Sequence, residues 1–248
     1  EIERKVFVIP KKLQISSNSI ESREFFAIEW NGIGLFKVAF YIFNSFDLLQ
    51  QFHIPNDQFF IFLFNIKSKY NDLPYHNWIH AIDVLQYSFY EIKKSKFENI
   101  LTKLELLGIF IASISHDTNH DGFTNPYHQK AQTPIGILYK DLSINEMNHC
   151  AMTIDVFNQI ETNIFHAIPD NDLKRIWSLI IQLILSTDMG LHFKILKNAN
   201  DIMDQGPVNL SNPKHRFMTM SLILKIADIS NASRPFYIAE NWCDVLDD

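Results

Sequence analysis

The sequence predicts an all-α protein that folds as one compact domain of about nine to ten helices. Apolar residues recur at helical spacing along most of the chain, and no segments with strand-like alternation form convincing pairs. Only 7 of the 248 residues are glycine, well below the usual ~7%, which disfavours folds with many tight turns. The 47% hydrophobic content, with 21 phenylalanines, is ample for a sizeable core.

The first half of the chain contains four expected helices. Residues 1–21 are Ser- and Asn-rich and indicate a lead-in strand or linker, so the domain is placed at 22–248. Segment 34–49 carries an apolar stripe, and a turn around Pro55 separates it from a second apolar helix over 57–70. The Leu73-Pro74 break precedes a helix over 76–94, and a strongly apolar run predicts another over 101–115.

The second half begins with the turn-rich segment 118–134, expected to be a loop with short helical pieces. Ser143 and Glu146 have capping-box spacing, which predicts a helix over 143–160. Three further helix starts are marked by proline near the first turn. These helices are expected at 169–185, at 212–229, and from 234 to residue 248.

Composition excludes several classes of function. The net charge is −6 and no dense Lys/Arg run occurs, so a nucleic-acid partner is not expected. No apolar run approaches the ~20 residues that span a bilayer, and no phosphate-binding glycine loop is present. Cys150 and Cys243 form no CxxC pair and are expected to be reduced and packed. An intracellular, cytoplasmic protein is expected, or one at the cytoplasmic face of a membrane if the full protein is anchored.

Two histidines mark the start of the expected helix at 76–94. His76 and His80 are four residues apart, a spacing that places two side chains on one helical face. Zinc proteases pair histidines in this way but place a glutamate, their base, after the first one. Asn77 stands there instead, so one shared zinc with that chemistry is not indicated.

A second polar group follows the apolar helix at 101–115. His116, Asp117, His120 and Asp121 come where a buried helix end meets a polar loop. Asp228 likewise follows a buried apolar run. A buried carboxylate beside imidazoles is costly unless it meets a cation, although a helix end with a turn, or a capping role, would also explain these residues. His80, His116, Asp117 and Asp228 together offer the mixed nitrogen and oxygen ligands that suit Zn²⁺ or Fe²⁺.

A third pair, Glu146 and His149, is open to two interpretations. Glu146 fits the capping box of Ser143, and this explanation suffices for the pair taken alone. A di-iron carboxylate bundle would need a second ExxH motif, and the chain has none. If spare carboxylates and histidines lie near the first metal, they could hold a water-rich Mg²⁺. Two ions about 3.5–4 Å apart are a recognised device for phosphoester hydrolysis.

These motifs occur in an order that resembles a known family. The segments PYHNWIHAIDV, SHDTNHDGFTN, NEMNHC, LSTDMG and ADISN are similar to those of the catalytic domain of class I 3′,5′-cyclic nucleotide phosphodiesterases, over roughly residues 25–248. The resemblance implies the all-helical metal-hydrolase fold of that family. It also implies hydrolysis of the 3′ phosphoester bond of cyclic AMP or cyclic GMP to the 5′-monophosphate.

The resemblance implies a role for each matching residue. His76 resembles the general acid that protonates O3′, and the zinc ligands correspond to His80, His116, Asp117 and Asp228, with Asp117 bridging to Mg²⁺ or Mn²⁺. The residues that orient metal-bound waters correspond to His120, Glu146, His149 and Thr187. The substrate pocket would include Tyr75, His76, Asp117, Asp188, Met189, Asp228 and Asn231.

The resemblance also implies parts that residues 1–248 do not contain. The family domain continues for several helices beyond Asp248, so the domain is expected to be C-terminally incomplete. That part supplies the glutamine and phenylalanine that hold the base and a glutamate that orients the acid histidine, so nucleotide selectivity cannot be predicted. Regulatory domains would precede residue 1, and a homodimer is left open. Two alternatives remain: another His-Asp phosphohydrolase acting on nucleoside phosphates, and a catalytically silent cyclic-nucleotide-binding domain.

Overall fold

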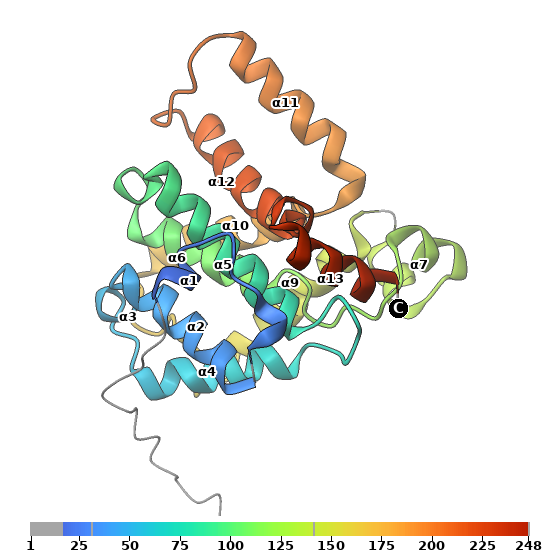
Figure 1. Ribbon diagram of the computed structural model, residues 1–248, viewed down its shortest axis with the longest axis horizontal. Coiled ribbons are helices and arrows are strands. Elements are labelled where there is room, and N and C mark those ends of the chain that lie inside the picture. Colours follow the sequence, from blue (N-terminus) through green and yellow to red (C-terminus); the bar gives the residue numbers. More distant parts are fainter. Residues whose placement is uncertain (1–16, 31, 141, 248) are drawn as a thin grey trace, which may run out of the picture.

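The computed structural model describes residues 17–30, 32–140 and 142–247, and every regular element in those ranges is a helix. The all-α prediction is therefore confirmed for the described part of the chain. Two helices, α5 (Trp78–Ser95) and α6 (Lys103–Ser115), pack together at the centre of the molecule (Figure 1). Around them, α10 (Asp170–Leu185) packs on α6, and α2 (Gly32–Ser45) and α12 (Pro213–Asp228) pack on α5.

The apolar run at the end of α6 explains its central place. Every residue from 106 to 115 is buried, so this part of the helix is covered on all sides. A capping box starts the helix, because Thr102 accepts from the Glu105 amide and Glu105 accepts from the Thr102 amide. His116 and Asp117 follow directly and are carried into the interior.

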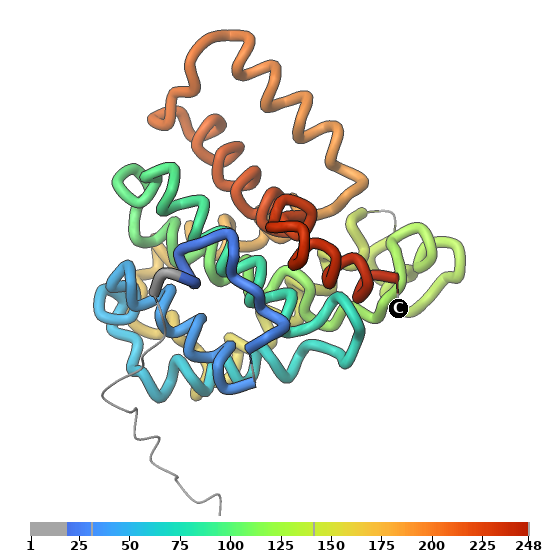
Figure 2. Tube along the Cα trace, in the orientation of Figure 1, coloured from blue at the N-terminus to red at the C-terminus, as the bar shows by residue number. Residues whose placement is uncertain are grey.

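The N-terminal helices form a layer beside α5. They are α1 (Ser17–Ile20), η1 (Ala27–Glu29), α2, α3 (Leu48–Gln51) and α4 (Asn56–Ser68), shown in blue to cyan in Figure 2. The expected helix over 34–49 is divided, because Asp47 has a left-handed φ of 54° between α2 and α3. Asp tolerates this conformation better than most residues. Residues 1–16 of the lead-in expected at 1–21 lie outside the described residues. Residues 17–20 are helical, whereas a strand or linker was expected.

The middle of the chain contains the predicted short helical pieces, α7 (Asn125–Ala131) and α8 (Pro134–Tyr139), followed by α9 (Ile144–Phe157). The predicted capping box at the start of α9 is wrong. Ser143 has a φ of 43° and makes no capping bond, because its hydroxyl donates to Asp188 at 2.7 Å. Glu146 instead accepts from the side chain of Asn125, at 2.9 Å. Ser143 and Glu146 therefore have the spacing of a capping box without its hydrogen bonds. The Glu146 carboxylate does not cap the helix and can contribute to a site.

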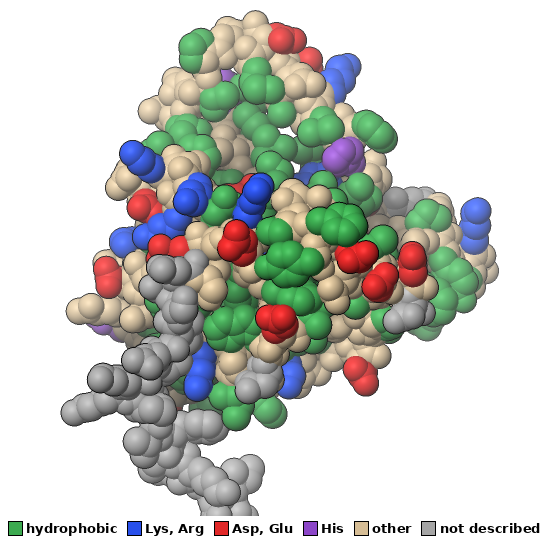
Figure 3. All heavy atoms as spheres, in the orientation of Figure 1, with side chains coloured by type: hydrophobic (Ala, Val, Ile, Leu, Met, Phe, Trp, Pro, Cys, Tyr) green, Lys and Arg blue, Asp and Glu red, His purple; other side chains and the backbone are tan. Residues whose placement is uncertain are grey.

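The C-terminal helices are η3 (Met189–Leu191), α11 (His192–Asp204), α12, η4 (Ser230–Ser233) and α13 (Phe236–Asp247). The short helix η2 (Phe97–Asn99) lies between α5 and α6. Helix α11 was not predicted and stands away from the central helices beside α12 (Figures 1 and 2). Among its residues only Ala199 is buried. Figure 3 shows hydrophobic side chains at the surface of this part of the molecule. The exposed hydrophobic residues of α11 and α13 include Phe193, Met203 and Phe236.

Two predictions made from composition have direct outcomes. Cys150 is buried as expected, whereas Cys243 lies on the outer side of α13 and is exposed, so the packed thiol predicted there is wrong. Across the described ranges, no single helix has the length and apolarity needed to cross a bilayer. One pair, α10 with the η3–α11 segment, meets the criteria of length and composition only when its two parts are taken together, and it is bent by 83°.

Candidate metal centre

The loop before α5 separates the two histidines of the first motif. Asn77 is the N-cap of α5, and its side-chain oxygen accepts from the amides of Ile79 and His80 at 2.8 and 3.2 Å. His76 therefore precedes the helix, and the expectation that both imidazoles project from one helical face is wrong. Asn77 stands where zinc proteases have a glutamate, and its role here is to cap the helix that carries His80.

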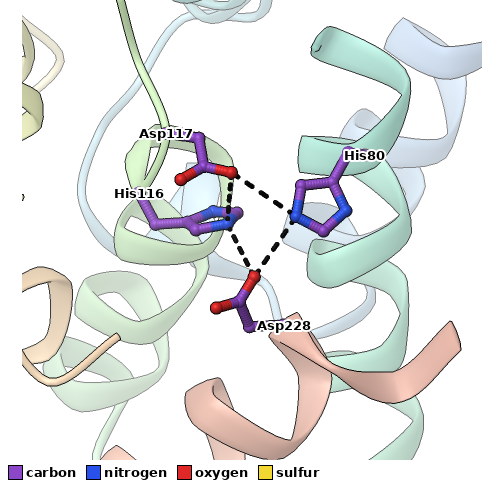
Figure 4. A group of neighbouring side chains, drawn as sticks. All are labelled: His80, His116, Asp117 and Asp228. Carbon is purple, nitrogen blue, oxygen red and sulfur yellow. Dashed lines mark hydrogen bonds and ion pairs between the residues drawn. The ribbon is translucent and has the colours of Figure 1, made fainter. Parts of the chain in front are cut away.

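Four side chains meet at one point between α5, the end of α6 and the end of α12 (Figure 4). The Nε2 atom of His80 lies 3.2 Å from Asp228 Oδ1 and 3.5 Å from Asp117 Oδ2. The Nε2 atom of His116 lies 3.1 Å from each of the same two oxygens. One ligand atom from each residue lies within 4.8 Å of all the others. These are the four residues predicted as metal ligands.

The chemistry of this cluster fits a cation. Asp117 Oδ2 is buried and has no well-aligned hydrogen-bond donor among the described residues, although His116 Nε2 lies 3.1 Å away, and a carboxylate oxygen in this position is costly without positive charge. Burial opposes ionisation, yet the His116 imidazolium holds the pKa values of Asp117 and Asp228 below their usual range. The two carboxylates in turn raise the pKa of His116 well above its ordinary value, despite its burial. A divalent ion placed among these atoms would supply the positive charge that otherwise requires a proton.

Hydrogen bonds to the backbone orient two of the imidazoles. His116 donates from Nδ1 to the carbonyl of Ser113 at 2.9 Å, which leaves Nε2 facing the cluster. His149 donates from Nδ1 to the carbonyl of Thr118 at 2.7 Å, and its Nε2 lies 3.7 Å from Asp117 Oδ1. Burial lowers the pKa of His149 to about 4, so the neutral ring is favoured. His149 therefore presents an unprotonated nitrogen to the second oxygen of Asp117, and both atoms can accept from a water or bind a cation.

Three histidines form a row beside the cluster. The rings of His76 and His120 are stacked with centroids 3.9 Å apart, and the ring of His149 lies 5.7 Å beyond His120. His76 lies 6.3 Å from His80, ring to ring. Burial lowers the pKa of His76 to about 4 and also lowers that of His120. The structure thus places His76 near the four-residue cluster but outside it.

The remaining predicted residues are distributed around the same site. Tyr75 lies over His80 with ring centroids 4.7 Å apart, and its hydroxyl accepts from Asn231 at 2.9 Å. Glu146 and Thr187 are held by other partners: Asn125 donates to Glu146, and the Thr187 hydroxyl donates to the carbonyl of Ile184. Burial raises the pKa of Glu146 to about 7.

Asp188 and Met189, predicted for the substrate pocket, lie in the turn after α10. Asp188 accepts from Ser143 at 2.7 Å and caps the short helix η3 through the amide of Gly190. Met189 is 57% exposed, which fits a residue at the rim of a site better than one inside it. No described contact joins either side chain to the four-residue cluster.

A model of the family described as 3'5'-cyclic nucleotide phosphodiesterase matches residues 75–248, which include the whole cluster. The chain belongs to this family. The solved phosphodiesterase domain of a rhodopsin phosphodiesterase fusion from the choanoflagellate Salpingoeca rosetta is similar in fold, with a TM-score of 0.87 and 28% identity. That similarity covers 92% of this chain and 72% of the other. Both the predicted family and its fold are confirmed.

Two curated relatives within the phosphodiesterase family illustrate the range of similarity. The 3',5'-cyclic-nucleotide phosphodiesterase regA of Dictyostelium discoideum is 29% identical over 90% of this chain. The human high affinity cGMP-specific 3',5'-cyclic phosphodiesterase 9A is 31% identical over 83% of it. The chain spans only 28% and 34% of the lengths of these two relatives.

Sequence reasoning missed several polar residues that support this phosphodiesterase site. Lys225 is 3% exposed, and its ammonium lies 3.4 Å from the carbonyl oxygens of Ser186 and Thr187, so it holds the turn that follows α10. The side-chain amide of Asn125 donates to the Glu146 carboxylate and accepts from the backbone amide of Asn145, both in the first turn of α9. Lys225 lies in KIADISN, but its apolar neighbours indicated only a buried helix, and no local pattern predicts which carbonyls a buried lysine will meet.

Proposed function

We propose that this chain hydrolyses the 3′ phosphoester bond of a 3′,5′-cyclic nucleotide and releases the 5′-monophosphate. The observation that carries the proposal is the His80–His116–Asp117–Asp228 cluster with His76 beside it, in a chain of the phosphodiesterase family. Mixed imidazole and carboxylate ligands suit a hydrolytic metal, and a separate histidine at the edge of the cluster suits proton transfer.

We assign the four clustered residues to Zn²⁺ and the outer side of Asp117 to Mg²⁺ or Mn²⁺. The zinc assignment is supported by two nitrogen and two oxygen donors within 4.8 Å of one another. The second assignment is supported by Asp117 Oδ1, a carboxylate oxygen of the kind that Mg²⁺ prefers, which faces His149 at 3.7 Å. Bound divalent ions would polarise the phosphoryl oxygens and lower the pKa of the attacking water.

The chain's own residues then handle the proton. As the P–O3′ bond breaks, its electron pair goes to O3′, which takes a proton from His76. The water oxygen bonds to phosphorus and gives up one of its protons to solvent. Burial lowers the pKa of His76 to about 4, so the ring is neutral near pH 7 before substrate binds. A cyclic phosphate carries a negative charge, and an opposite charge within about 4–6 Å raises a histidine pKa. Substrate binding would thus charge the acid that acts on it.

The residues around the cluster are assigned supporting roles. The stacked ring of His120, 3.9 Å from His76, restricts the orientation of the acid. His120, His149, Glu146 and Thr187 are proposed to orient waters on the second ion. Tyr75 and Asn231, which hydrogen-bond to each other beside His80, are proposed to contact the nucleotide, with Asp188 and Met189 toward the phosphate.

The direct test is hydrolysis of cyclic AMP and cyclic GMP by the purified chain with Zn²⁺ and Mg²⁺ supplied. Both substrates are compared because the human relative is named as cGMP-specific, whereas the name of the Dictyostelium relative carries no such restriction. The matched control is Asp228→Asn, which keeps the side-chain size and removes one ligand charge. Release of 5′-monophosphate by the parent chain alone supports the proposal. A folded, metal-loaded chain that binds cyclic nucleotide without cleaving it would support the silent-domain alternative.

A further inference from the structure

A buried arginine joins the end of α12 to the helix that carries His80. Arg234 is 4% exposed and follows Asp228 by six residues, across the short helix η4. Its guanidinium binds the carboxylate of Asp83 twice, Nη2 to Oδ1 at 2.9 Å and Nε to Oδ2 at 3.2 Å. The same Nη2 also donates to the side chain of Gln86 at 3.0 Å. Asp83 lies three residues, about one helical turn, beyond His80 on α5.

The turn between Asp228 and Arg234 is held in a fixed shape. The Arg234 amide donates to the carbonyl of Asn231, and the Ser233 hydroxyl donates to that of Ser230 at 2.8 Å. The hydroxyl of Tyr87, on α5, lies 2.8 Å from that of Ser233. Because η4 is held in this way, the contact between the Arg234 guanidinium and α5 also fixes how the end of α12, where Asp228 lies, is placed against α5.

His80 needs this connection more than the other histidines of the cluster do. His116 and His149 are each oriented by a hydrogen bond from Nδ1 to a backbone carbonyl. His80 Nδ1 is buried and makes no hydrogen bond with the described residues. Its Nε2 is therefore directed at Asp228 by the placement of α5 and by ring packing, with the centroids of Tyr75 and Trp242 at 4.7 and 6.0 Å from that of His80. The 3.2 Å separation of His80 and Asp228 thus depends on how α5 sits against the end of α12.

We propose that Arg234 is a positioning residue of the metal centre, which sets the separation of His80 and Asp228 by binding Asp83. The inference rests on the proposed metal site, but it assigns a role to a pair that touches neither metal nor substrate. Only arginine offers a planar fork that binds both oxygens of Asp83 and Gln86 together. Lysine at this position would keep the charge and lose the two-point contact.

A second arginine pair in the same chain provides the matched control. Arg216, near the start of α12, binds Glu105 of α6 with Nη2 2.6 Å from Oε2, and it also donates to the carbonyl of Ile100 at 2.7 Å. This pair again joins an arginine to a carboxylate on a neighbouring helix, but Arg216 is on α12 itself, whereas Arg234 follows η4. The Arg216 pair lies at the opposite end of α12 from Asp228. Replacing either arginine by lysine removes the same kind of contact, but only one of the two contacts lies beside the metal ligands.

The experiment titrates the full chain with Co²⁺ and follows its visible absorption, with thermal unfolding measured in parallel. We expect Arg234→Lys to weaken Co²⁺ binding on the order of 10–100-fold and to shift the absorption bands, as loss of an outer contact does in other metal sites. Arg216→Lys is expected to lower the unfolding temperature while leaving the affinity and the bands unchanged. Because Co²⁺ binding is measured without substrate, the result does not depend on the proposed hydrolysis.

A second variant guards against a failure of Arg234→Lys to fold. Asp83→Asn keeps the size of the side chain and one acceptor oxygen, so it weakens the same contact more gently, and a smaller shift of the same bands is expected. The inference is overturned if the folded variants bind Co²⁺ with the affinity and spectrum of the parent chain. It is also overturned if Arg216→Lys changes the spectrum equally, because that result would assign both arginines to general stability.

Discussion

At the scale of single residues, the first motif contains two histidines with different environments. His80 is on the helix and 1% exposed, with Nε2 directed at two carboxylates. His76 precedes the N-cap, stacks on His120 and makes no contact with those carboxylates among the described interactions. The separation follows from Asn77, which starts the helix between them. A ligand and a proton donor can therefore come from one short segment.

The first prediction concerns His76. His76→Ala is expected to lower kcat by roughly 10²–10⁴-fold, the usual contribution of a positioned acid, while the chain retains its metal. Steady-state kinetics and metal content measured on the same sample separate the two effects. Asp228→Ala serves for comparison and is expected to lose metal as well as turnover. Full turnover by His76→Ala would show that another group protonates O3′.

The second prediction concerns Glu91 on α5, which lies away from the metal centre. Its Oε2 is buried without a hydrogen-bond partner among the described residues, and burial raises its pKa to about 8 from 4.5. Between these values the folded chain keeps a proton that the unfolded chain releases. Stability is therefore present below pH 4.5 and lost as the pH rises toward 8, by up to about 1.4 kcal/mol per pH unit.

Glu91→Gln removes this titration, so the variant is expected to be more stable than the parent chain at pH 8 and similar to it near pH 4.5. Thermal unfolding at a series of pH values measures the difference. The exposed residue Glu29 provides the control, because Glu29→Gln changes no buried group. Parallel pH profiles for the parent and Glu91→Gln chains would mean that Glu91 is already ionised in the fold.

Three of the four candidate metal ligands could be predicted from sequence because they lie at positions where burial and polarity conflict. His116 and Asp117 end a run of ten buried residues, and Asp228 ends another apolar helix. The supporting contacts could not be predicted in this way. Arg234 and Asp83 are 151 residues apart, and neither has a neighbour that indicates its partner. The capping box predicted for Ser143 and Glu146 was wrong for the opposite reason. The local pattern was present, but the two side chains bind Asp188 and Asn125 instead of each other's backbone.

At the scale of elements, long apolar helices were predicted well and exposed or divided ones were not. The expected helix at 101–115 corresponds to α6, and the one at 169–185 to α10. Helix α11 was missed because it buries only Ala199 and carries polar residues along much of its length. The break at Asp47 depends on a left-handed residue that apolar periodicity does not register.

The third prediction concerns the contact between α7 and α8. A Cβ atom at Gly136 would lie 2.2 Å from the carbonyl oxygen of His128, and backbone cannot move aside as a side chain can. Gly136→Ala is therefore expected to destabilise the fold by about 1–3 kcal/mol, the usual cost of overpacking. Gly32→Ala is the control, since no atom lies within 4 Å of its Cβ position. Equal unfolding temperatures for the two variants would contradict the packing described here.

At the scale of the whole molecule, the candidate metal centre joins parts of the chain that are distant in sequence. Its ligands come from α5, from the end of α6 and from the end of α12, positions 80, 116–117 and 228. The carboxylates of Asp117 and Asp228 face the same two imidazoles, and their mutual repulsion opposes the fold when no cation is present. The three helices therefore meet most stably around positive charge.

The last prediction follows from this arrangement. A cation that binds only the folded chain adds about 2.7 kcal/mol of stability at 100 times its Kd, so chelation of a zinc-loaded sample is expected to lower Tm by roughly 5–10 °C. Scanning calorimetry with and without EDTA measures the change. Asp228→Asn should show little response to EDTA, because the variant has lost a ligand and its charge. If the Tm of the parent chain is unchanged by zinc and by EDTA, then His116 carries the balancing proton and the cluster holds no structural cation.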